Sequence, residues 1–506
     1  MTSLNLASVL REPARRQPDT VALIAEGRPH TYAEVWDAAL VVADRLLTAG
    51  ATAGDSVGLL GHNSPEFIAG YFGVLAAGCV VIPVPPMSRP AEVVELLRAG
   101  GARHLLHDSD LTDLIPTAAV SSLELDFGER RFVTQHTFPV SRSPSDPAVV
   151  MFTSGTTGTP KGALLSHLNL VMNATVNAFD LNHFTNKDVV LACLPLFHTY
   201  GQTVAMNAVF RAGGRLVLQR RFDGHDALAL MREHSVTSFV GVPTMFVRLL
   251  EAASDSPDIP SLRAATSGGA SLPLAVLERF QDVFGAIVTE GYGLSETSPT
   301  CAINQPEIGV RAGTVGHPIW GVDVEIADAS IEDRVALLPT GDLGELVIRG
   351  HNVFNGYLDN PAATASAIVD GWFRTGDLGR VDADGFISIV DRKKELIIRG
   401  GYNVYPREVE EVFARLPGIL HVAVIGIPHP VLGEEVCAVI MPADGAILSE
   451  VELLEAGRNR LAAHKYPRQV VLVDEMPVGP SQKILKRALV DIVRSKLEGT
   501  HNPTAH

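Results

Sequence analysis

Cysteine is scarce in this sequence of 506 residues. The four cysteines, Cys79, Cys193, Cys301 and Cys437, lie far apart and form no Cys-x-x-Cys pair. Disulfide frameworks and zinc sites need cysteines that are more numerous or more closely spaced. The sequence therefore predicts neither kind of site, and it indicates a reduced protein of the cytoplasm.

An excess of positive charge is also missing. The chain has 41 Lys and Arg residues against 57 Asp and Glu residues, a formal net charge of -16. Nucleic-acid-binding surfaces are basic, so this balance predicts no nucleic-acid partner. An anionic small ligand would have to be held by local cations and backbone N–H groups.

No apolar run has the length that a membrane span requires. Residues 67–82 carry no charge, but they fall short of the ~20 residues of a spanning helix, and Gly78 and Pro83 interrupt the pattern. The first residues turn polar within about ten positions, unlike a signal peptide. We expect no membrane span here, and instead a buried helix that leads into a buried strand.

Strands and helices alternate through the first 310 residues or so. The expected strands include residues 57–60, 149–153, 189–194, 215–218 and 237–240, and the expected helices include 35–46, 167–179, 227–233 and 244–252. The Thr31–Glu34 spacing is typical of a capping box. This alternation predicts parallel sheets that are covered by helices on both faces.

The pattern changes twice after residue 310. Short strands between Gly, Asp and Pro turns predict a β-barrel-like subdomain at about residues 310–390. Residues 395–506 predict a small, mobile α+β domain, whose first helix starts at Pro406. The expected fold class is thus α/β, with an N-terminal domain of two helix-covered sheets over residues 1–390 and a hinge at residues 391–394.

The segment TSGTTGTPKG, residues 153–162, follows an apolar strand and is expected to lead into a helix. Its glycines allow close backbone approach, its hydroxyls donate hydrogen bonds, and Lys161 supplies a positive charge. These properties predict a loop that holds phosphate groups. It is not a Walker A loop, because Pro160 precedes the lysine and Gly162 follows it.

This loop resembles the phosphate loop of the adenylate-forming superfamily, which includes acyl-CoA synthetases, peptide-synthetase adenylation domains and firefly luciferase. Four further segments resemble that family in the expected order. They are GYGLSETS (291–298), TGDLG (375–379), DRKKELIIRGGYNVYP (391–406) and PSQKILKRAL, which contains Lys483. The resemblance spans nearly the whole chain, and fatty-acid and 4-coumarate CoA ligases are the most similar branches.

The resemblance implies an ATP site. Glu296 would help to hold Mg²⁺, Tyr292 would stack on adenine, and Asp377, assisted by Arg392, would bind the ribose hydroxyls. The implied ATP-binding residues are Thr153, Ser154, Gly155, Thr156, Thr157, Gly158, Lys161, Gly269, Ala270, Tyr292, Gly293, Ser295, Asp377, Arg392 and Lys483. The implied catalytic residues are Lys161, Glu296 and Lys483.

Lys483 resembles the lysine that stabilises the adenylation transition state, where two anions meet. The family usually has Gly before this lysine, and Gln482 stands there in this chain. Lys394 resembles the hinge pivot about which the small domain turns. The paired Gly400 and Gly401 would then line a tunnel for the thiol of coenzyme A or of a carrier protein's phosphopantetheine.

The segment LPLFHTYG, residues 194–201, resembles the border of the acyl pocket. Amino-acid-activating relatives usually carry Asp where this chain has His198, so an α-amino acid is not expected. The candidate substrate residues are His198, Gly241, Val242, Gly269 and Gly293. The apolar segment 239–245, with Ala205 and Met206, favours an apolar acid.

Three functions remain open from the sequence. The first is an acyl-CoA ligase for a fatty acid of medium to long chain, or for an aryl or cinnamate-type acid. The second is a ligase that loads an acyl carrier protein. The third is a luciferase-like oxygenase or a catalytically impaired nucleotide-binding homologue. The sequence leaves the exact acid, the thiol acceptor and the oligomeric state open.

Overall fold

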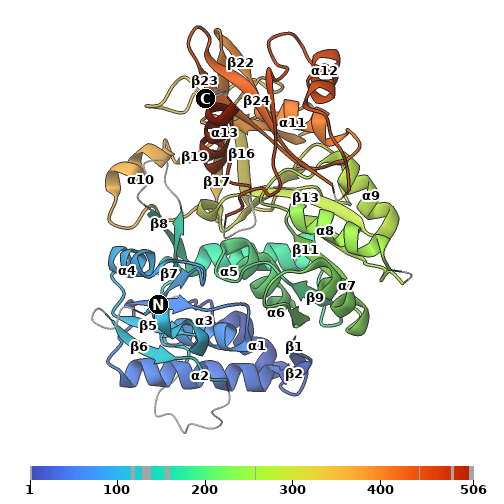
Figure 1. Ribbon diagram of the computed structural model, residues 1–506. Helices are drawn as coiled ribbons and strands as arrows, with labels where there is room; N and C mark the ends of the chain where they lie inside the picture. The colour runs from blue at the N-terminus through green and yellow to red at the C-terminus, as the bar shows by residue number, and fades with distance from the viewer. Residues whose placement is uncertain are drawn as a thin grey trace, which may run out of the picture.

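The computed structural model describes residues 3–115, 120–127, 138–153, 160–256, 258–443, 445–479 and 484–500. A large N-terminal part contains two mainly parallel sheets with helices packed around them. A smaller C-terminal part lies at the top of Figure 1, where its strands are orange and red. The α/β fold class and the order of a large domain before a small one are as predicted. The domain boundary at the 391–394 hinge stays a prediction.

The first sheet has six strands in the order β6-β5-β3-β4-β7-β8. All neighbouring pairs are parallel except β7 and β8, which are antiparallel. The strands are β3 (Ser56–Leu60), β4 (Val80–Val84), β5 (His104–His107), β6 (Ser121–Glu124), β7 (Pro147–Thr153) and β8 (Lys161–Ser166).

The helices of this sheet confirm two local predictions. In α2 (Tyr32–Thr48), Thr31 and Glu34 form the predicted capping box, with each side chain bonded to the other's backbone N–H. In α3 (Pro65–Ala76), Ser64 caps the first turn, and every residue from Phe67 to Ala76 is buried. Because β4 is buried as well, residues 67–82 are the expected buried helix and strand.

The second sheet has nine strands in the order β15-β14-β13-β12-β11-β9-β10-β1-β2. The middle of the sheet, from β13 to β1, is parallel, and antiparallel strands close both edges. The strands are β1 (Val21–Ala25), β2 (Arg28–Thr31), β9 (Val189–Ala192), β10 (Arg215–Leu218), β11 (Ser238–Gly241), β12 (Ala264–Ser267), β13 (Ile287–Gly293), β14 (Thr300–Ile303) and β15 (His317–Pro318).

The remaining helices of the N-terminal part pack around these two sheets, except α10, which lies against β18 (Ile368–Val369) and β19 (Trp372–Val381) of the third sheet (Figure 1). They are α1 (Ser8–Arg16), α4 (Pro90–Ala99), α5 (His167–Val176), α6 (Ala208–Ala212), α7 (Gly224–Glu233), α8 (Pro243–Ser254), α9 (Leu274–Phe284) and α10 (Pro361–Ala367). Single turns of 3-10 helix lie at Ser109–Leu114 and Ser295–Thr297, and π-helix at Asn177–Leu181 and Gly201–Asn207.

The expectation that residues 153–162 lead directly into a helix is wrong. Strand β8 intervenes and pairs with β7 as a hairpin, and α5 begins only at His167. Residues 161–166 form a strand because their second edge is also hydrogen-bonded, to a segment far along the chain. The Leu164 N–H donates to Gly356 O, and the Leu358 N–H donates to Gly162 O. The helix expected over 167–179 also ends early, at Val176, and continues as the π-helical turn.

The third sheet is antiparallel, as the change of pattern after residue 310 predicts. Its path is β16-β17-β19-β18, with β20 also paired to β19. The strands are β16 (Val322–Ala327), β17 (Gly344–Gly350), β18 (Ile368–Val369), β19 (Trp372–Val381) and β20 (Ile387–Arg392). In Figure 1 this sheet lies between the second sheet and the C-terminal part.

The C-terminal part is α+β, as predicted. Pro406 stands in the first turn of α11 (Pro406–Ala414), followed by α12 (Glu450–Arg460) and α13 (Lys486–Thr500). The strands are β21 (Ile397–Arg399), β22 (Tyr402–Val404), β23 (Ile419–His429), β24 (Gly433–Pro442) and β25 (Gln469–Leu472). Alternate residues of β23 and β24 belong to two separate apolar clusters, so both faces of this sheet are covered.

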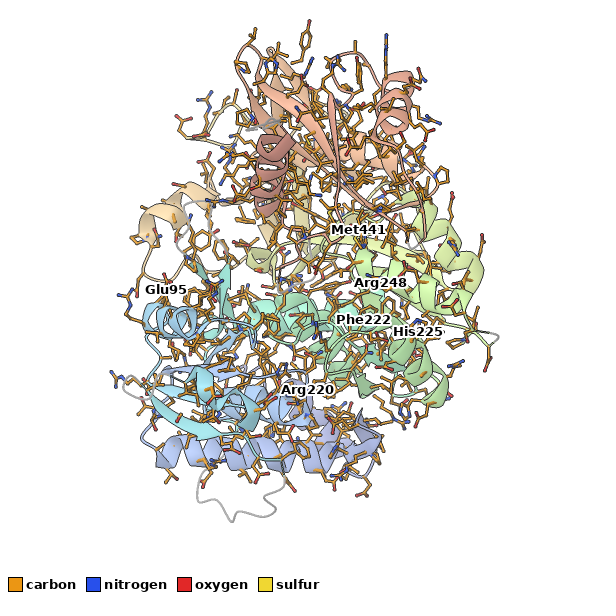
Figure 2. The ribbon with its side chains drawn as sticks, viewed as in Figure 1. Glu95, Arg220, Phe222, His225, Arg248 and Met441 are labelled. Atoms are coloured by element: carbon orange, nitrogen blue, oxygen red, sulfur yellow. The ribbon has the colours of Figure 1, made fainter. Side chains whose placement is uncertain are left out.

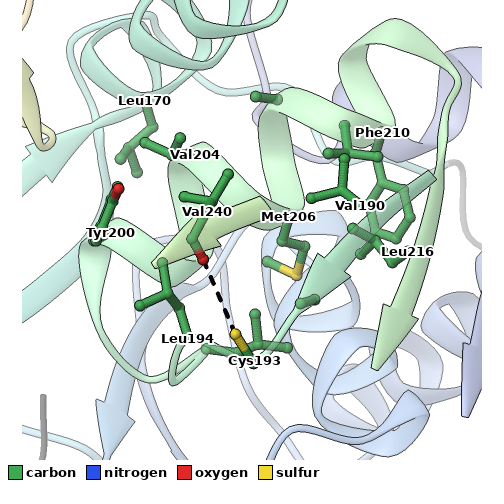
Figure 3. Packing of buried hydrophobic residues seen from close by; sticks show 14 of the residues in the cluster. Leu170, Val190, Cys193, Leu194, Tyr200, Val204, Met206, Phe210, Leu216 and Val240 are labelled. Carbon is green, nitrogen blue, oxygen red and sulfur yellow. Dashed lines mark hydrogen bonds between the residues drawn. The ribbon is translucent and has the colours of Figure 1, made fainter. Parts of the chain in front are cut away.

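One apolar core runs through both large sheets. Figure 3 shows a section of it, where Val190 of β9, Phe210 of α6 and Leu216 of β10 pack together. All four cysteines are buried and free, and Cys193 in this section directs its sulfur toward Val240 O at 4.0 Å. Among the described residues, no helix combines the length and the apolar character that a membrane crossing needs.

The charge of Arg248 in the N-terminal part acts on His421 in the C-terminal part. Figure 2 shows Met441 of β24 above Arg248 of α8, and His421 is the cross-strand partner of Met441. Burial, and then the charge of Arg248, lower the pKa of His421 to about 4. His421 is therefore neutral at pH 7, which suits a position beside a guanidinium group.

Candidate active site

The predicted site residues gather where the parallel strands of the second sheet end. Gly241 ends β11, Gly269 follows β12, and Tyr292 and Gly293 end β13. The carboxyl ends of parallel strands form one edge of a sheet, and this edge is the usual ligand site of α/β folds. Glycine is required at 293, because a Cβ atom there would lie 1.8 Å from the carbonyl oxygen of Pro299.

Tyr292, Asp377 and Arg392 form one polar group. The Tyr292 hydroxyl donates to Asp377 Oδ2 at 2.5 Å, and Arg392 Nε lies 3.2 Å from Asp377 Oδ1. Asp377 on β19 and Arg392 on β20 are cross-strand partners, so the third sheet fixes their spacing. The Asp377 charge raises the pKa of Arg392, while burial and then Asp377 raise that of Tyr292. The Arg392 guanidinium therefore stays charged and the Tyr292 phenol stays neutral at pH 7.

Glu296 lies on the 3-10 turn Ser295–Thr297 and is 8 % exposed. Its Oε1 accepts a hydrogen bond from the Tyr357 hydroxyl at 2.9 Å. The ammonium group of Lys161 lies 5.2 Å from the centroid of the Tyr357 ring. The structure thus places two of the predicted catalytic residues, Lys161 and Glu296, on either side of one tyrosine.

The predicted phosphate loop is described only at its ends. Thr153 at the end of β7 pairs with Lys161 at the start of β8, and the Thr153 hydroxyl donates to Lys161 O at 3.4 Å. The remaining predicted loop residues, together with Gln482 and Lys483, lie outside the described residues. These loop residues are Ser154, Gly155, Thr156, Thr157 and Gly158.

The predicted acyl residues line a narrow cavity. The volume open to the centre of a water molecule is about 10 Å³, room for roughly one water. Of the predicted residues, His198, Val242 and Gly269 line this cavity; Gly241 and Gly293 do not. The lining residues are Leu194, Pro195, His198, Tyr200, Gly201, Val242 and Gly269.

The expected apolar wall of residues 239–245 is mostly wrong as a cavity lining. Only Val242 of that segment reaches the cavity, while Phe239 packs in the core against Phe246 with ring centroids 5.1 Å apart. Met206 is likewise fully buried in the core and appears there in Figure 3. Side chains alternate across a strand, so neighbouring residues in a segment cannot all face one cavity.

Two tyrosines that the motif analysis did not single out contact the site. Tyr200 closes the cavity, and its hydroxyl donates to Thr266 O at 3.3 Å and Gly241 O at 3.5 Å. The position of Tyr200, two residues after His198 in the same segment, could have indicated that it belongs to the site. Tyr357 contacts both Lys161 and Glu296. No sequence signal could have indicated Tyr357, because none of the five family motifs contains it.

Glu290 is a third residue that the motifs did not indicate. It is 3 % exposed, and its Oε1 accepts hydrogen bonds from Ser271 Oγ at 3.3 Å and from the Leu272 N–H at 3.2 Å. Burial raises the pKa of Glu290 to about 7, and Arg407 of the C-terminal part opposes this rise. Glu290 thus holds the segment that follows Gly269 and Ala270, both of which are exposed at the site.

Lys394, Gly400 and Gly401 belong to the junction and the edge of the C-terminal sheet. Lys394 lies exposed between β20 and β21. Gly400 and Gly401 form the turn between β21 and β22 with φ of 57° and 83°, a backbone region that favours glycine. Their roles as hinge and thiol tunnel stay predictions.

A tyrosine–aspartate–arginine group, a lysine and a carboxylate that both contact Tyr357, and a cavity are assembled from the start of β8, the ends of β12 and β13, and the third sheet. Such a set of charged and hydrogen-bonding side chains is typical of an enzyme that binds a small anionic ligand. Two sequence families match the chain: AMP-binding enzyme over residues 10–358, and AMP-binding enzyme C-terminal domain over residues 408–483. The chain belongs to the AMP-binding enzyme family, which confirms the predicted adenylate-forming superfamily and the class of ATP-dependent, AMP-forming ligase.

Individual relatives match over almost the full length. A feruloyl-CoA synthase from Amycolatopsis sp. is 35% identical over 476 residues, covering 94% of this chain and 96% of the relative. A long-chain-fatty-acid–CoA ligase from Bacillus subtilis is 32% identical over 533 residues, covering 96% and 94%. The solved o-succinylbenzoate coenzyme A synthetase of Bacillus subtilis, with ATP and magnesium, has a TM-score of 0.85 and 29% identity, covering 95% and 98%.

Proposed function

We propose that this chain is an acyl-CoA ligase. It joins an apolar carboxylic acid to ATP as an acyl-adenylate with release of pyrophosphate, and then transfers the acyl group to the thiol of coenzyme A. The observation that carries the proposal is the cavity lined by His198, Val242 and Gly269, the last of which follows β12 at the carboxyl edge of the second sheet. Among the described residues, none of those that line the cavity carries a fixed charge, so it suits an apolar acid whose carboxylate faces the nucleotide.

Tyr292, Asp377 and Arg392 would hold the nucleoside end of ATP. The remaining lone pairs of Asp377 can accept hydrogen bonds from ribose hydroxyls, and the ring of Tyr292 offers a face to adenine. Lys161 and the loop that precedes it would bind the phosphates. The ammonium group and backbone N–H groups stabilise the negative charge that develops as the acid attacks the α-phosphate.

The residues present also suit magnesium. The described residues contain no group of three or more His, Cys, Asp or Glu side chains that could hold a metal by themselves. Mg²⁺ in nucleotide enzymes usually takes one or two carboxylates, and waters and phosphate oxygens complete its shell. Glu296 supplies such a carboxylate beside the predicted phosphate position, so it would hold a metal that arrives with ATP.

The favoured acid is a fatty acid of medium to long chain. An aryl or cinnamate-type acid is the second candidate, because the Tyr200 ring lines the cavity and could pack against a flat aromatic substrate. The 35% identity to a feruloyl-CoA synthase supports this second candidate. A carrier-protein acceptor is the alternative to coenzyme A.

Pyrophosphate release measured across a panel of acids tests the proposal. The panel contains octanoate, palmitate, ferulate, 4-coumarate and alanine, each with and without coenzyme A. We expect release with at least one apolar acid, a thioester only when coenzyme A is present, and no release with alanine. Adenylate formation without any coenzyme A thioester would favour the carrier-protein acceptor, and no release with any acid would reject the proposal.

A further inference from the structure

Tyr357 is held from several sides before it meets any ligand. It lies opposite Ala163 of β8 in an antiparallel bridge, and the backbone bonds between Leu164 and Gly356 and between Leu358 and Gly162 flank it. Its own N–H donates to the Thr364 hydroxyl of α10 at 2.9 Å. The position of its ring relative to Lys161 is therefore set by the strand pairing.

The segment that carries Tyr357 also holds Glu296. The Phe354 N–H donates to the backbone oxygen of Glu296 at 2.9 Å, while the Tyr357 hydroxyl donates to its carboxylate. The Phe354 and Tyr357 rings pack edge to face with centroids 4.9 Å apart. The backbone and the side chain of Glu296 are thus both bonded to residues 354–357.

Buried amides hold the neighbouring backbone. Asn173 of α5 donates to Thr300 O at 2.8 Å, and Asn169, one turn earlier, donates to Val353 O at 3.0 Å. Asn352 donates to Thr300 O at 3.0 Å and joins the two loops. The turn with Glu296 and the segment with Tyr357 therefore rest on the same helix.

A neutral phenol hydroxyl suits the position of Tyr357 beside the Glu296 carboxylate. Burial, and then the Glu296 charge, raise the pKa of Tyr357, so the hydroxyl remains a donor at physiological pH. A neutral donor fixes one carboxylate oxygen without cancelling the charge and leaves the other oxygen for a cation. The face of the same ring attracts the Lys161 ammonium group.

We propose that Tyr357 is a positioning residue, which orients the Glu296 carboxylate toward the magnesium ion of the bound nucleotide and holds Lys161 beside it. The inference rests on the proposed function, in which Glu296 meets Mg²⁺. Tyr357 is not proposed to touch substrate or to transfer a proton.

Tyr357→Phe is the direct test, because it removes the hydroxyl and keeps the ring against Lys161 and Phe354. Manganese binding in the presence of ATP, followed by EPR, reads the metal site without turnover. We expect the half-saturating manganese concentration to rise about fivefold, the size of one lost hydrogen bond. The half-saturating Mg²⁺ concentration in pyrophosphate exchange should rise to a similar extent.

Tyr32→Phe is the matched control. Tyr32 is fully buried, and its hydroxyl donates to Gly214 O at 2.5 Å away from the site, so the same atom is lost elsewhere. This variant should lose thermal stability with no change in metal dependence. Wild-type manganese binding in folded Tyr357→Phe would overturn the proposal.

Two more variants extend the test. Tyr357→His keeps a ring against Lys161, but its ring nitrogen stops short of the position of the phenol oxygen, so it should weaken manganese binding about as much as Tyr357→Phe; it replaces that variant if Tyr357→Phe folds poorly, and wild-type binding would count against the proposal. In a Glu296→Gln background, Tyr357→Phe should add no further change, because the oriented charge is already gone. Failure of the wild type to release pyrophosphate with any acid would reject the proposed function, while the manganese titration would still test Tyr357.

Discussion

The side of the site that we propose for the nucleotide and the side that we propose for the acid are built differently. On the nucleotide side, Tyr292, Asp377 and Arg392 are joined by short bonds, and Glu296 is bonded to Tyr357. On the acyl side, apolar groups and backbone enclose a cavity with room for about one water. Hydrogen bonds demand particular residue types at particular positions, whereas an apolar wall accepts many residues of similar size. The comparison predicts that single substitutions affect the nucleotide side more strongly.

The largest expected effect is at Lys483. Lys483→Ala should slow adenylation about 10²-fold or more, because a positioned cation is lost where two anions meet. Thioester formation from a preformed adenylate should be much less affected. Pyrophosphate exchange and single-turnover thioester formation measure the two steps. Near-normal exchange would show that Lys483 is not the adenylation lysine, and Lys187→Ala, at an exposed position before β9, is the control for loss of a surface charge.

The next largest effect is expected for Asp377→Asn. It removes the charge that accepts from Tyr292 and pairs with Arg392, and hydrogen bonds to charged groups contribute about 1.5–3 kcal/mol. We expect the KM for ATP to rise about tenfold or more, with little change in the KM for the acid. Asp323→Asn is the control, because Asp323 pairs with Arg349 at 2.8 Å on the exposed face of the third sheet. Equal changes in both KM values would contradict the division of the site into two sides.

The raised pKa of Glu290 predicts that the free energy of unfolding depends on pH. Its folded-state pKa of about 7 exceeds the ordinary 4.5, so its contribution is fully present below about pH 4.5 and is lost as pH rises through 7. Glu290→Gln keeps the group neutral. We expect the variant to be more stable than wild type at pH 8 by about 1–2 kcal/mol, and the difference to vanish near pH 4.5. Denaturant unfolding at several pH values measures this, and a difference that is constant with pH would refute the assignment.

The smallest expected effect is on the acyl side. Tyr200→Phe removes hydrogen bonds to Thr266 O and Gly241 O but leaves the ring that closes the cavity. We expect the KM for the acid to change by about threefold, with the KM for ATP unchanged. Tyr200→Ala should shift preference toward larger acids. A change in ATP dependence as large as that of Asp377→Asn would remove the contrast between the two sides.

Much of the fold follows from local sequence patterns. The capping box at Thr31 and Glu34, the buried helix after Ser64 and the helix start at Pro406 lie where the sequence predicts them. Each depends on contacts between residues a few positions apart, which a sequence displays directly. Strand β8 was missed because its pairing with residues 356–358 joins positions almost 200 residues apart.

The candidate site also has features that local sequence patterns predict and features that depend on long-range contacts. The motifs predict Lys161, Glu296 and Asp377 in one site; in the structure Lys161 and Glu296 both contact Tyr357, and Asp377 is bonded to Tyr292. The lining of the cavity was predicted less well, because the direction of each side chain depends on how strands and helices pack. Phe239 faces the core and Val242 the cavity, although they are three residues apart.

The sequence by itself determined the class of enzyme and the order of its domains, and it predicts the polar residues of the proposed nucleotide site. Short motifs suffice there because the chemistry of phosphate, ribose and metal restricts the residue types. Only the tertiary structure decided that Tyr200 closes the acyl cavity and that Tyr357 joins Lys161 to Glu296. Those contacts come from strand pairing and helix packing over long separations in the chain, and no local pattern encodes them.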